Sequence, residues 1–403
     1  MPARQHHGGD ASSGARRPIA LVICPVLPYP PSSGGRKRTL RLLEAMERAG
    51  MTPWLITVDA GPAGASDALR KRGWSVDVVP EAPQGRAARA LQHLRRRPSP
   101  YLSSVATRLT ALRSQGPRFV QVEHPQSAYY ERTFAGLPSV LSAHNVDSEI
   151  WKGVAASHRP LTPAWARGWV RWQAMRAAER RGARVSDTVL CVSERDAGYF
   201  ERFTSDIVVV PNGVDDAFFA SSLRAPAAEH VLFFGEYTYA PNLEGMRRFI
   251  REGWPALAAA RPAARLRLAG AGMPASLTRL ARAAPRIDVL GFVDDLVAEL
   301  EGSRLVVVPL WQGGGTRLKV VEALAAGRPA VGTALGVEGV GFRDGVHGAL
   351  AETPAGLAAA AARLLADPDW TANAAVECRR LAEGFRWKRV TQPAERLYAR
   401  WAA

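Results

Sequence analysis

Three consecutive glycines, Gly313–Gly315, stand between an apolar run of strand length, Leu305–Pro309, and a segment of helical periodicity that begins near Thr316. Glycines at the start of a helix let backbone N–H groups approach a phosphate closely, and the helix dipole favours negative charge there. Arg317 and Lys319 place two positive charges beside this loop. The pattern predicts a phosphate-binding loop, although its spacing is neither that of a Walker loop nor that of a GxGxxG fingerprint.

Glu322 lies in the same helical segment, among apolar neighbours such as Val320, Val321 and Leu324. A carboxylate buried without a partner is costly, so Glu322 should face a hydroxyl or a cation, and a ribose diol would be a suitable partner. On spacing alone a second interpretation stays open, in which the glycines form only a tight turn and Glu322 is a solvated helix residue.

Short apolar runs alternate with helical segments, such as Arg38–Ala49, along most of the chain, which is typical of an α/β protein with parallel sheets. The runs form two series, so the sequence predicts two successive parallel-sheet domains with a cleft between them. Ligands of such sheets bind outside the carboxyl ends of the strands. The expected strands are Ile19–Val26, Trp54–Val58, Ser75–Val79, Phe119–Val122, Ser139–Ala143, Thr188–Val192 and Ile207–Val210 in the first domain, and Val231–Gly235, Arg265–Ala269, Ile287–Leu290, Leu305–Pro309 and Ala330–Gly332 in the second.

The charge of the chain is positive and unevenly distributed. Its 403 residues include 53 Lys and Arg against 37 Asp and Glu, a net charge of +16. Residues 1–205 hold 30 Lys and Arg against 16 Asp and Glu, whereas residues 206–403 hold 23 against 21. We therefore expect the N-terminal half to meet something acidic. Arg86–Arg97 is a basic amphipathic segment, for which contact with an anionic membrane and a solvated arginine-rich face are both open interpretations.

Composition argues against several classes of protein. No apolar stretch reaches roughly 18 residues, so a membrane-spanning helix is not expected. Three distant cysteines argue against a disulfide framework or a zinc knuckle and favour a cytoplasmic location. No His, Asp and Cys cluster has metal-ligand spacing, so neither a metal nor another cofactor is expected. A nucleic-acid-binding protein is disfavoured, because the basic excess is confined to one half and no recognition motif appears.

Several motifs occur in an order that resembles retaining glycosyltransferase family 4, over nearly all the chain from Pro18. The resemblance implies the GT-B fold, in which two Rossmann-like domains face each other. It also implies transfer of a sugar from a UDP-, GDP- or dTDP-linked donor to an acceptor hydroxyl, with retention of the anomeric configuration. Besides the stretch from Gly313 to Val331, the motifs are PYPPSSGGRKRTLRLLEAM, SAHNVDSE, VLCVSERD, VVPNGVD, LGFVDDL, DGVHGALAETPAGLAAAAARLLADP and FRWKRV.

The resemblance assigns Glu322 to the second acid of the family's Glu-x7-Glu motif, which holds the donor ribose. The first acid falls at Gly314, so the chain is similar to a GGGTRLK-type branch of the family. Backbone N–H groups of Gly315 and Thr316 are then expected to take over part of the missing role.

The family's basic pair after the first strand of the second domain is also missing, because Gly235 is followed by Glu-Tyr-Thr-Tyr. Arg317 and Lys319 are therefore the expected partners of the diphosphate. Phe292 and Val293 match the loop whose backbone reads the nucleotide base in the family, and an ordinary core role is the open alternative.

In the first domain, the resemblance places Gly34 and Gly35 in a loop near the donor phosphates and the acceptor, whereas a simple turn is the alternative. His144 ends an apolar run and is expected to contact the donor sugar. Glu123 and His124 end another run and are expected to face the acceptor. A structural role stays open for each of these three side chains.

The glycine- and serine-containing start of the chain lacks the apolar core of a signal peptide and predicts a flexible tail over residues 1–17. The resemblance implies an acceptor-side domain over 18–205, a donor-binding domain over 206–385 and a terminal helix over 386–403 that packs back toward the first domain. The acceptor would be a glycan, a lipid-linked glycan or a small molecule, at the cytoplasmic face of a membrane or in the cytoplasm. A catalytically inactive homologue, suggested by Gly314, and a nucleotide-sugar epimerase that needs no acceptor are the alternatives.

Overall fold

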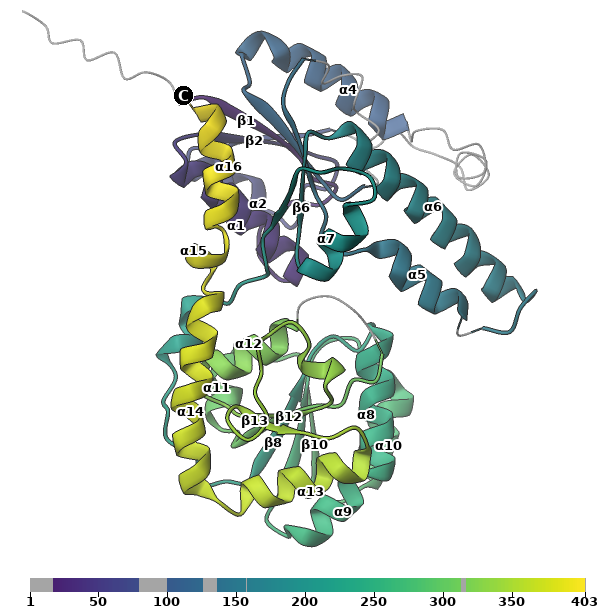
Figure 1. Cartoon of the computed structure of the whole chain (residues 1–403), viewed down its shortest axis with the longest axis vertical. Helices are drawn as coiled ribbons and strands as arrows, with labels where there is room; N and C mark the ends of the chain where they lie inside the picture. Colours follow the sequence, from purple (N-terminus) through teal and green to yellow (C-terminus); the bar gives the residue numbers. More distant parts are fainter. Residues whose placement is uncertain (1–16, 80–99, 126–135, 157, 313–316, 403) are drawn as a thin grey trace, which may run out of the picture.

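The computed structural model describes residues 17–79, 100–125, 136–156, 158–312 and 317–402, and Figure 1 shows two α/β domains stacked along the long axis of the molecule. The first contains a seven-stranded parallel sheet in the order β3-β2-β1-β4-β5-β6-β7. Its strands are β1 (Ile19–Ile23), β2 (Thr52–Thr57), β3 (Ser75–Val78), β4 (Phe119–Glu123), β5 (Ser139–Ser142), β6 (Thr188–Cys191) and β7 (Ile207–Val209).

The second domain contains a six-stranded parallel sheet in the order β10-β9-β8-β11-β12-β13. In both sheets the strand order reverses at the first strand, so the polypeptide leaves a crevice at the carboxyl ends of the strands, where ligands of such sheets bind. The strands are β8 (His230–Phe234), β9 (Arg265–Ala269), β10 (Ile287–Gly291), β11 (Leu305–Val308), β12 (Ala330–Gly332) and β13 (Gly348–Leu350).

Helices cover both faces of each sheet, because buried parallel strands are apolar on both sides. In the first domain, one core cluster packs under α1 and α2 and another under α4, while α5 and α6 extend outward and α7 follows β6. In the second, α8, α9, α10 and α13 share one core cluster, and α11, α12 and α14 share the other. The helices of the first domain are α1 (Gly34–Arg48), α2 (Ala65–Lys71), α4 (Pro100–Leu112), α5 (Asp147–Ala156), α6 (Pro163–Val185) and α7 (Glu194–Phe200); those that follow are α8 (Ala240–Glu252), α9 (Trp254–Ala260), α10 (Ala275–Ala283), α11 (Leu296–Glu301), α12 (Leu318–Ala325), α13 (Pro354–Leu365), α14 (Pro368–Ala382), α15 (Trp387–Val390) and α16 (Gln392–Ala402).

The chain crosses between the domains twice, once after β7 and once on its way from α14 to α15. The two crossovers run side by side, since Val214 N donates to Phe385 O at 2.8 Å. The second crossover brings α16 back onto α1 of the first domain, as Figure 1 shows. Ala394, Leu397 and Tyr398 of α16 are buried in the core cluster of that domain. The last helix is therefore part of the first domain's core.

The predicted fold class is confirmed, and every predicted strand is present with ends that differ by up to three residues. Three local differences stand out. Helix α1 begins at Gly34, before the helical pattern, because the Ser33 hydroxyl accepts a hydrogen bond from Arg36 N and caps the helix there. Helix α12 begins at Leu318, later than the expected start near Thr316. Strand β13 has only three residues and was not foreseen.

Candidate active site

Two glycines at the start of α1 bring this helix close to the second domain and to His144. A Cβ atom on Gly34 would lie 3.2 Å from Cδ1 of Leu318, the first residue of α12. A Cβ atom on Gly35 would lie 3.3 Å from Nδ1 of His144. The amino ends of α1 and α12 therefore meet across the two domains, and both carry partial positive charge from their free N–H groups.

Lys37 of α1 links the domains. Its Nζ lies 3.4 Å from Oε1 of Glu322 on α12 and 3.5 Å from Oδ2 of Asp215 in the first crossover. Burial raises the pKa of the Glu322 carboxyl, and the positive charge of Lys37 opposes that rise. Burial disfavours charge on Lys37, but Glu322 and Asp215 outweigh it and raise the pKa of the ammonium group. Glu322 thus has the cation partner that a buried carboxylate requires.

Lys319 fills the space that opens after the first strand of the second domain. Gly235 follows β8, and a Cβ atom there would lie 2.9 Å from Nζ of Lys319. The ammonium group donates to Oδ1 of Asn242 at 2.6 Å and lies 4.3 Å from the centre of the Phe233 ring. Burial, followed by the charge of Arg317, lowers the pKa of Lys319 to about 7. A side chain at Gly235 would collide with this lysine.

Arg317 occupies the N-cap position of α12 and is buried, with Nε donating to Leu335 O at 3.0 Å. The predicted phosphate loop, Gly313, Gly314, Gly315 and Thr316, lies outside the described residues. Its two flanks are placed: β11 ends at Val308 and α12 begins at Leu318, so the loop connects the carboxyl end of a central strand to the amino end of a helix.

Glu123 ends β4, His144 lies just after the neighbouring strand β5, and the two form a buried pair with 2.6 Å between Oε2 and Nε2. Burial alone would raise the pKa of Glu123, but the hydrogen bonds from His144 and Gln121 hold it at about 2. The ionised carboxylate makes Nε2 of His144 the donor, so in the neutral imidazole Nδ1 is an acceptor. Within the described residues that Nδ1 is buried without a hydrogen-bond partner, on the side that faces Gly35.

A hydrogen-bonded chain supports this pair from behind. Tyr398 on α16 donates to Oε1 of Gln121 at 2.7 Å, and Nε2 of Gln121 donates to Oε1 of Glu123 at 2.6 Å. His124 has φ +70° and its ring centre lies 4.1 Å from that of His144. Burial and the neighbouring His144 lower the pKa of His124 to about 3, so its ring is neutral at physiological pH.

The remaining candidates follow β10 in the second domain. Phe292 exposes 72% of its surface, whereas Val293 packs against the core cluster under α12 and α14. The two neighbours therefore differ, since the phenyl ring is largely exposed whereas the Val293 side chain is half-buried. Among the described residues, no three His, Cys, Asp or Glu side chains are grouped so as to hold a metal ion. In the same part of the chain, no helix combines the length and apolar character needed to cross a bilayer.

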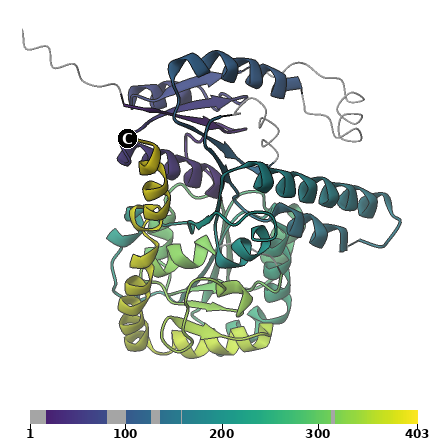
Figure 2. The same ribbon diagram turned by 45° about the horizontal axis from the view of Figure 1, so that its top comes forward.

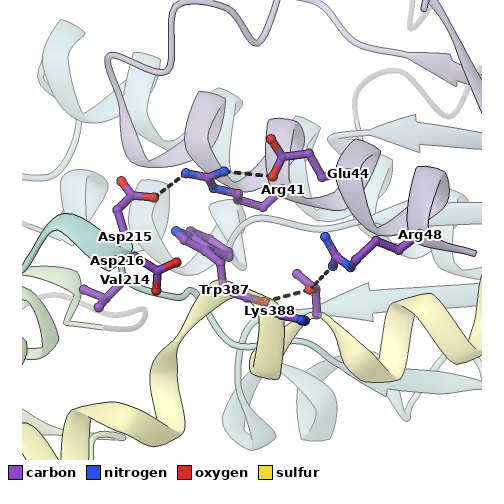
Figure 3. A pocket seen from close by; sticks show the side chains of 9 residues that line it. Arg41, Glu44, Arg48, Val214, Asp215, Asp216, Trp387 and Lys388 are labelled. Atoms are coloured by element: carbon purple, nitrogen blue, oxygen red, sulfur yellow. Dashed lines mark hydrogen bonds and ion pairs between the residues drawn. The ribbon is translucent and has the colours of Figure 1, made fainter. Parts of the chain in front are cut away.

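A separate pocket of ≈180 Å³ lies beside the crossovers, as Figure 3 shows. Side chains of α1 form one wall, and residues of the first crossover and of α15 with the following Thr391 form the others. In this pocket Asp215 accepts a hydrogen bond from Nη2 of Arg41 at 2.6 Å, and Nη2 of Arg48 donates to Thr391 at 2.8 Å. Its lining is Arg41, Glu44, Arg48, Val214, Asp215, Asp216, Trp387, Lys388 and Thr391.

Comparison with known protein families gives one match on each domain. The family described as Glycosyltransferase Family 4 matches residues 32–218, and the family described as Glycosyl transferases group 1 matches residues 228–367. A comparison with curated proteins gave no significant match.

Solved structures resemble the chain over nearly its whole length. Sucrose-phosphate synthase from Thermosynechococcus elongatus is 18% identical, with a TM-score of 0.71 over 95% of this chain and 99% of its own. HepE from Anabaena, in complex with UDP-glucose, is 17% identical, with a TM-score of 0.66 over 94% and 99%. WaaG, a glycosyltransferase involved in lipopolysaccharide biosynthesis, is 16% identical, with a TM-score of 0.66 over 95% and 99%. This shared fold, together with a glycosyltransferase family match on each domain, identifies the protein as a glycosyltransferase of the GT-B fold.

Proposed function

We propose that the enzyme transfers a sugar from a nucleotide-diphosphate sugar to an acceptor hydroxyl with retention of the anomeric configuration, as in the GGGTRLK-type branch of family 4. The observation that carries the proposal is the meeting of two helix amino ends, at Gly34 of α1 and Leu318 of α12, beside Lys37 and Lys319. Two helix amino ends, with two ammonium groups that both act on the Glu322 carboxyl, suit a diphosphate. The complex of HepE with UDP-glucose supports this class of donor.

In this proposal the donor nucleotide lies against the second domain. Glu322 holds the ribose diol, and Lys37 turns from Glu322 toward the diphosphate when the ribose arrives. Lys319, beside Gly235, and Arg317 bind the diphosphate together with the backbone of residues 313–316. Phe292 and Val293 contact the base.

The chemistry requires the bond between the anomeric carbon and the phosphate oxygen to break while the acceptor oxygen attacks from the same face. The positive groups stabilise the negative charge that develops on the leaving diphosphate. A diphosphate oxygen takes the proton of the acceptor hydroxyl, so the reaction needs no nucleophilic side chain from the enzyme. We assign the unpaired Nδ1 of His144 to a hydroxyl of the donor sugar, with Glu123 fixing the ring and Gly35 leaving room for the sugar.

The acceptor lies on the side of the first domain, near Glu123 and His124, and is a glycan, a lipid-linked glycan or a small molecule. WaaG acts in lipopolysaccharide biosynthesis, which supports an acceptor of the glycan class. The excess of Lys and Arg in the N-terminal half suits an acidic acceptor or the cytoplasmic face of an anionic membrane. The donor is a co-substrate, and the proposal includes neither a cofactor nor a metal.

The first test is a thermal-stabilisation screen of the purified protein with UDP, GDP and dTDP, followed by turnover with the matching sugar nucleotides. We expect one nucleotide to stabilise the protein, and Glu322→Ala to weaken its binding by about 1–3 kcal/mol, the range for losing a charged hydrogen bond. Glu377→Ala, which changes a half-buried glutamate of α14 that pairs with Arg380, is the matched control and should bind like wild type. Unchanged affinity in a folded Glu322→Ala variant would remove Glu322 from the donor site.

A further inference from the structure

Helices α5 and α6 form a hairpin that extends away from the rest of the first domain in both views (Figures 1 and 2). The two helices pack through small residues, since a Cβ atom on Gly168 would lie 3.0 Å from Cα of Ala155. Such close packing leaves little room for large side chains between the helices. Apart from Ala155 and Gly168, the described residues between 150 and 176 are half-buried or exposed.

Large apolar side chains are concentrated on the surface of this hairpin. Five of the nine exposed large apolar residues in the described chain belong to it: Ile150, Leu161, Trp169, Val170 and Val185. Leu161, in the turn between the helices, exposes 88% of its surface. Trp165, Trp169 and Trp172 recur at spacings of four and three, so they share one side of α6, and the first two rings stack at 6.3 Å. A concentrated apolar surface of this kind marks an interaction site.

Positive charge surrounds these apolar side chains. Arg159, Arg167 and Arg176 are exposed and form no ion pair within the described residues. The guanidinium group of Arg171 lies 4.6 Å from the centre of the Trp151 ring. Side chains of tryptophan, leucine and valine next to arginine favour the boundary between lipid headgroups and acyl chains. At that boundary the arginine reaches a phosphate and the apolar groups leave water.

We propose that this hairpin docks on the surface of an anionic lipid bilayer through residues 150–156 and 158–176. The hairpin then enters the headgroup region with Leu161, Trp169 and Val170, and its arginines pair with lipid phosphates. Helix α5 begins three residues after His144, and its base is tied to α6 by Ser148 N donating to Oε1 of Glu179 at 2.8 Å. A docked hairpin therefore holds the acceptor side of the site next to the membrane. This last point rests on the proposed function, whereas the docking itself does not.

The test is sedimentation of the full chain with phosphatidylcholine vesicles and with vesicles that also contain phosphatidylglycerol, in the absence of any donor. We expect binding to the anionic vesicles that weakens as salt increases, because salt screens the arginine contribution. Leu161→Ser with Trp169→Ser and Val170→Ser should lower the vesicle partition coefficient by about tenfold or more, since three apolar groups no longer leave water. Val376→Ser, which changes an exposed valine of α14, is the control and should bind like wild type.

A second variant, with Arg95, Arg96 and Arg97 changed to Gln, separates the hairpin from the basic segment predicted at Arg86–Arg97. The proposal is supported if this variant keeps vesicle binding while the hairpin variant loses it. It is overturned if wild type ignores anionic vesicles at low salt, or if only the variant at Arg95–Arg97 loses binding. Nucleotide stabilisation, measured on the same variants, shows whether each is folded and whether the donor site is intact.

Discussion

Lys319 is the residue whose charge should respond most to the donor. It is buried beside Gly235, its pKa is lowered to about 7, and its neighbours are a neutral amide, an aromatic ring and the charge of Arg317. A diphosphate at this place would raise that pKa, because a nearby negative charge favours the protonated amine. Donor binding and proton uptake by Lys319 are then linked.

The sign of the linkage gives a pH prediction. Donor affinity should be highest below pH about 7, where Lys319 is already protonated, and should fall by up to about tenfold per pH unit above it. The measurement is binding of an intact sugar nucleotide, whose doubly esterified diphosphate takes up no proton in this range. Lys319→Met should bind more weakly by about 2 kcal/mol, and this pH dependence should disappear. Lys388→Met changes an exposed lysine and should keep the wild-type profile; a sloping profile in Lys319→Met would assign the linkage to another group.

Some contacts between residues of the site can be predicted from the sequence, and others cannot. Glu123 and His144 follow apolar runs, so their proximity follows from strand order once the sheet is assumed. The place of Lys319 beside Gly235 was not predicted, since it depends on how α12 packs under β8. Asn242, Gln121 and Tyr398 were missed altogether. The bonds of Asn242 to Lys319 and of Tyr398 to Gln121 join residues far apart in the chain. Gln121 also donates to Glu123 two residues on, but nothing in the local sequence indicates any of these hydrogen bonds.

At the scale of elements, α16 is connected to the proposed sugar side of the site. It carries Tyr398, which is fully buried and stacks on Phe119 of β4 with 5.4 Å between ring centres. From its hydroxyl the hydrogen bonds run through Gln121 and Glu123 to His144. The last helix of the chain thus helps to orient the histidine through β4.

Tyr398→Phe tests this connection. Loss of the hydroxyl leaves Oε1 of Gln121 unpaired in the core, so unfolding should become easier by about 1–3 kcal/mol. We expect kcat to fall severalfold while the affinity for the free nucleoside diphosphate stays unchanged, because the chain of hydrogen bonds ends at His144 and not at Glu322. The comparison is Leu397→Ala, which weakens the packing of α16 without touching a hydrogen bond and should leave kcat unchanged well below its unfolding temperature. Equal loss of kcat in both variants would reduce Tyr398 to a packing role.

Among the elements, the strands were predictable because parallel strands with helices on both faces are apolar on both faces, which the sequence shows directly. The short strand β13, Gly348–Leu350, lacked that signal. The hairpin of α5 and α6 was not foreseen either, because its large apolar residues are exposed, and periodicity reports only which residues a helix buries. Its local sequence does hold one usable signal, the spacing of the tryptophans at 165, 169 and 172.

At the scale of the whole molecule, the two domains are joined by paired crossovers and by ion pairs. Asp215 in the first crossover accepts from Arg41 at 2.6 Å and lies 3.5 Å from Lys37, both on α1 (Figure 3 shows the pair with Arg41). Lys37 also pairs with Glu322 of the second domain. Lys37, Asp215 and Glu322 therefore connect the first domain, the crossover and the second domain. Arg195 and Glu338 form another pair between the domains at 3.5 Å, but both side chains are exposed.

Asp215 should therefore control how closely the domains approach, whereas the exposed pair should not, because exposed ion pairs contribute little. In Asp215→Asn the charges of Arg41 and Lys37 lose a shared carboxylate that is 23% exposed. We expect a larger radius of gyration in X-ray scattering of the free protein, a higher KM for the donor and a kcat close to wild type, since domain approach assembles the donor site without entering the chemical step. Added nucleotide should bring the radius back toward that of the wild-type complex.

Arg195→Gln is the matched control and should match wild type in all three measurements. If the radius and KM of Asp215→Asn equal those of wild type, the crossovers alone set the domain arrangement, and Asp215 serves only to pair with Arg41.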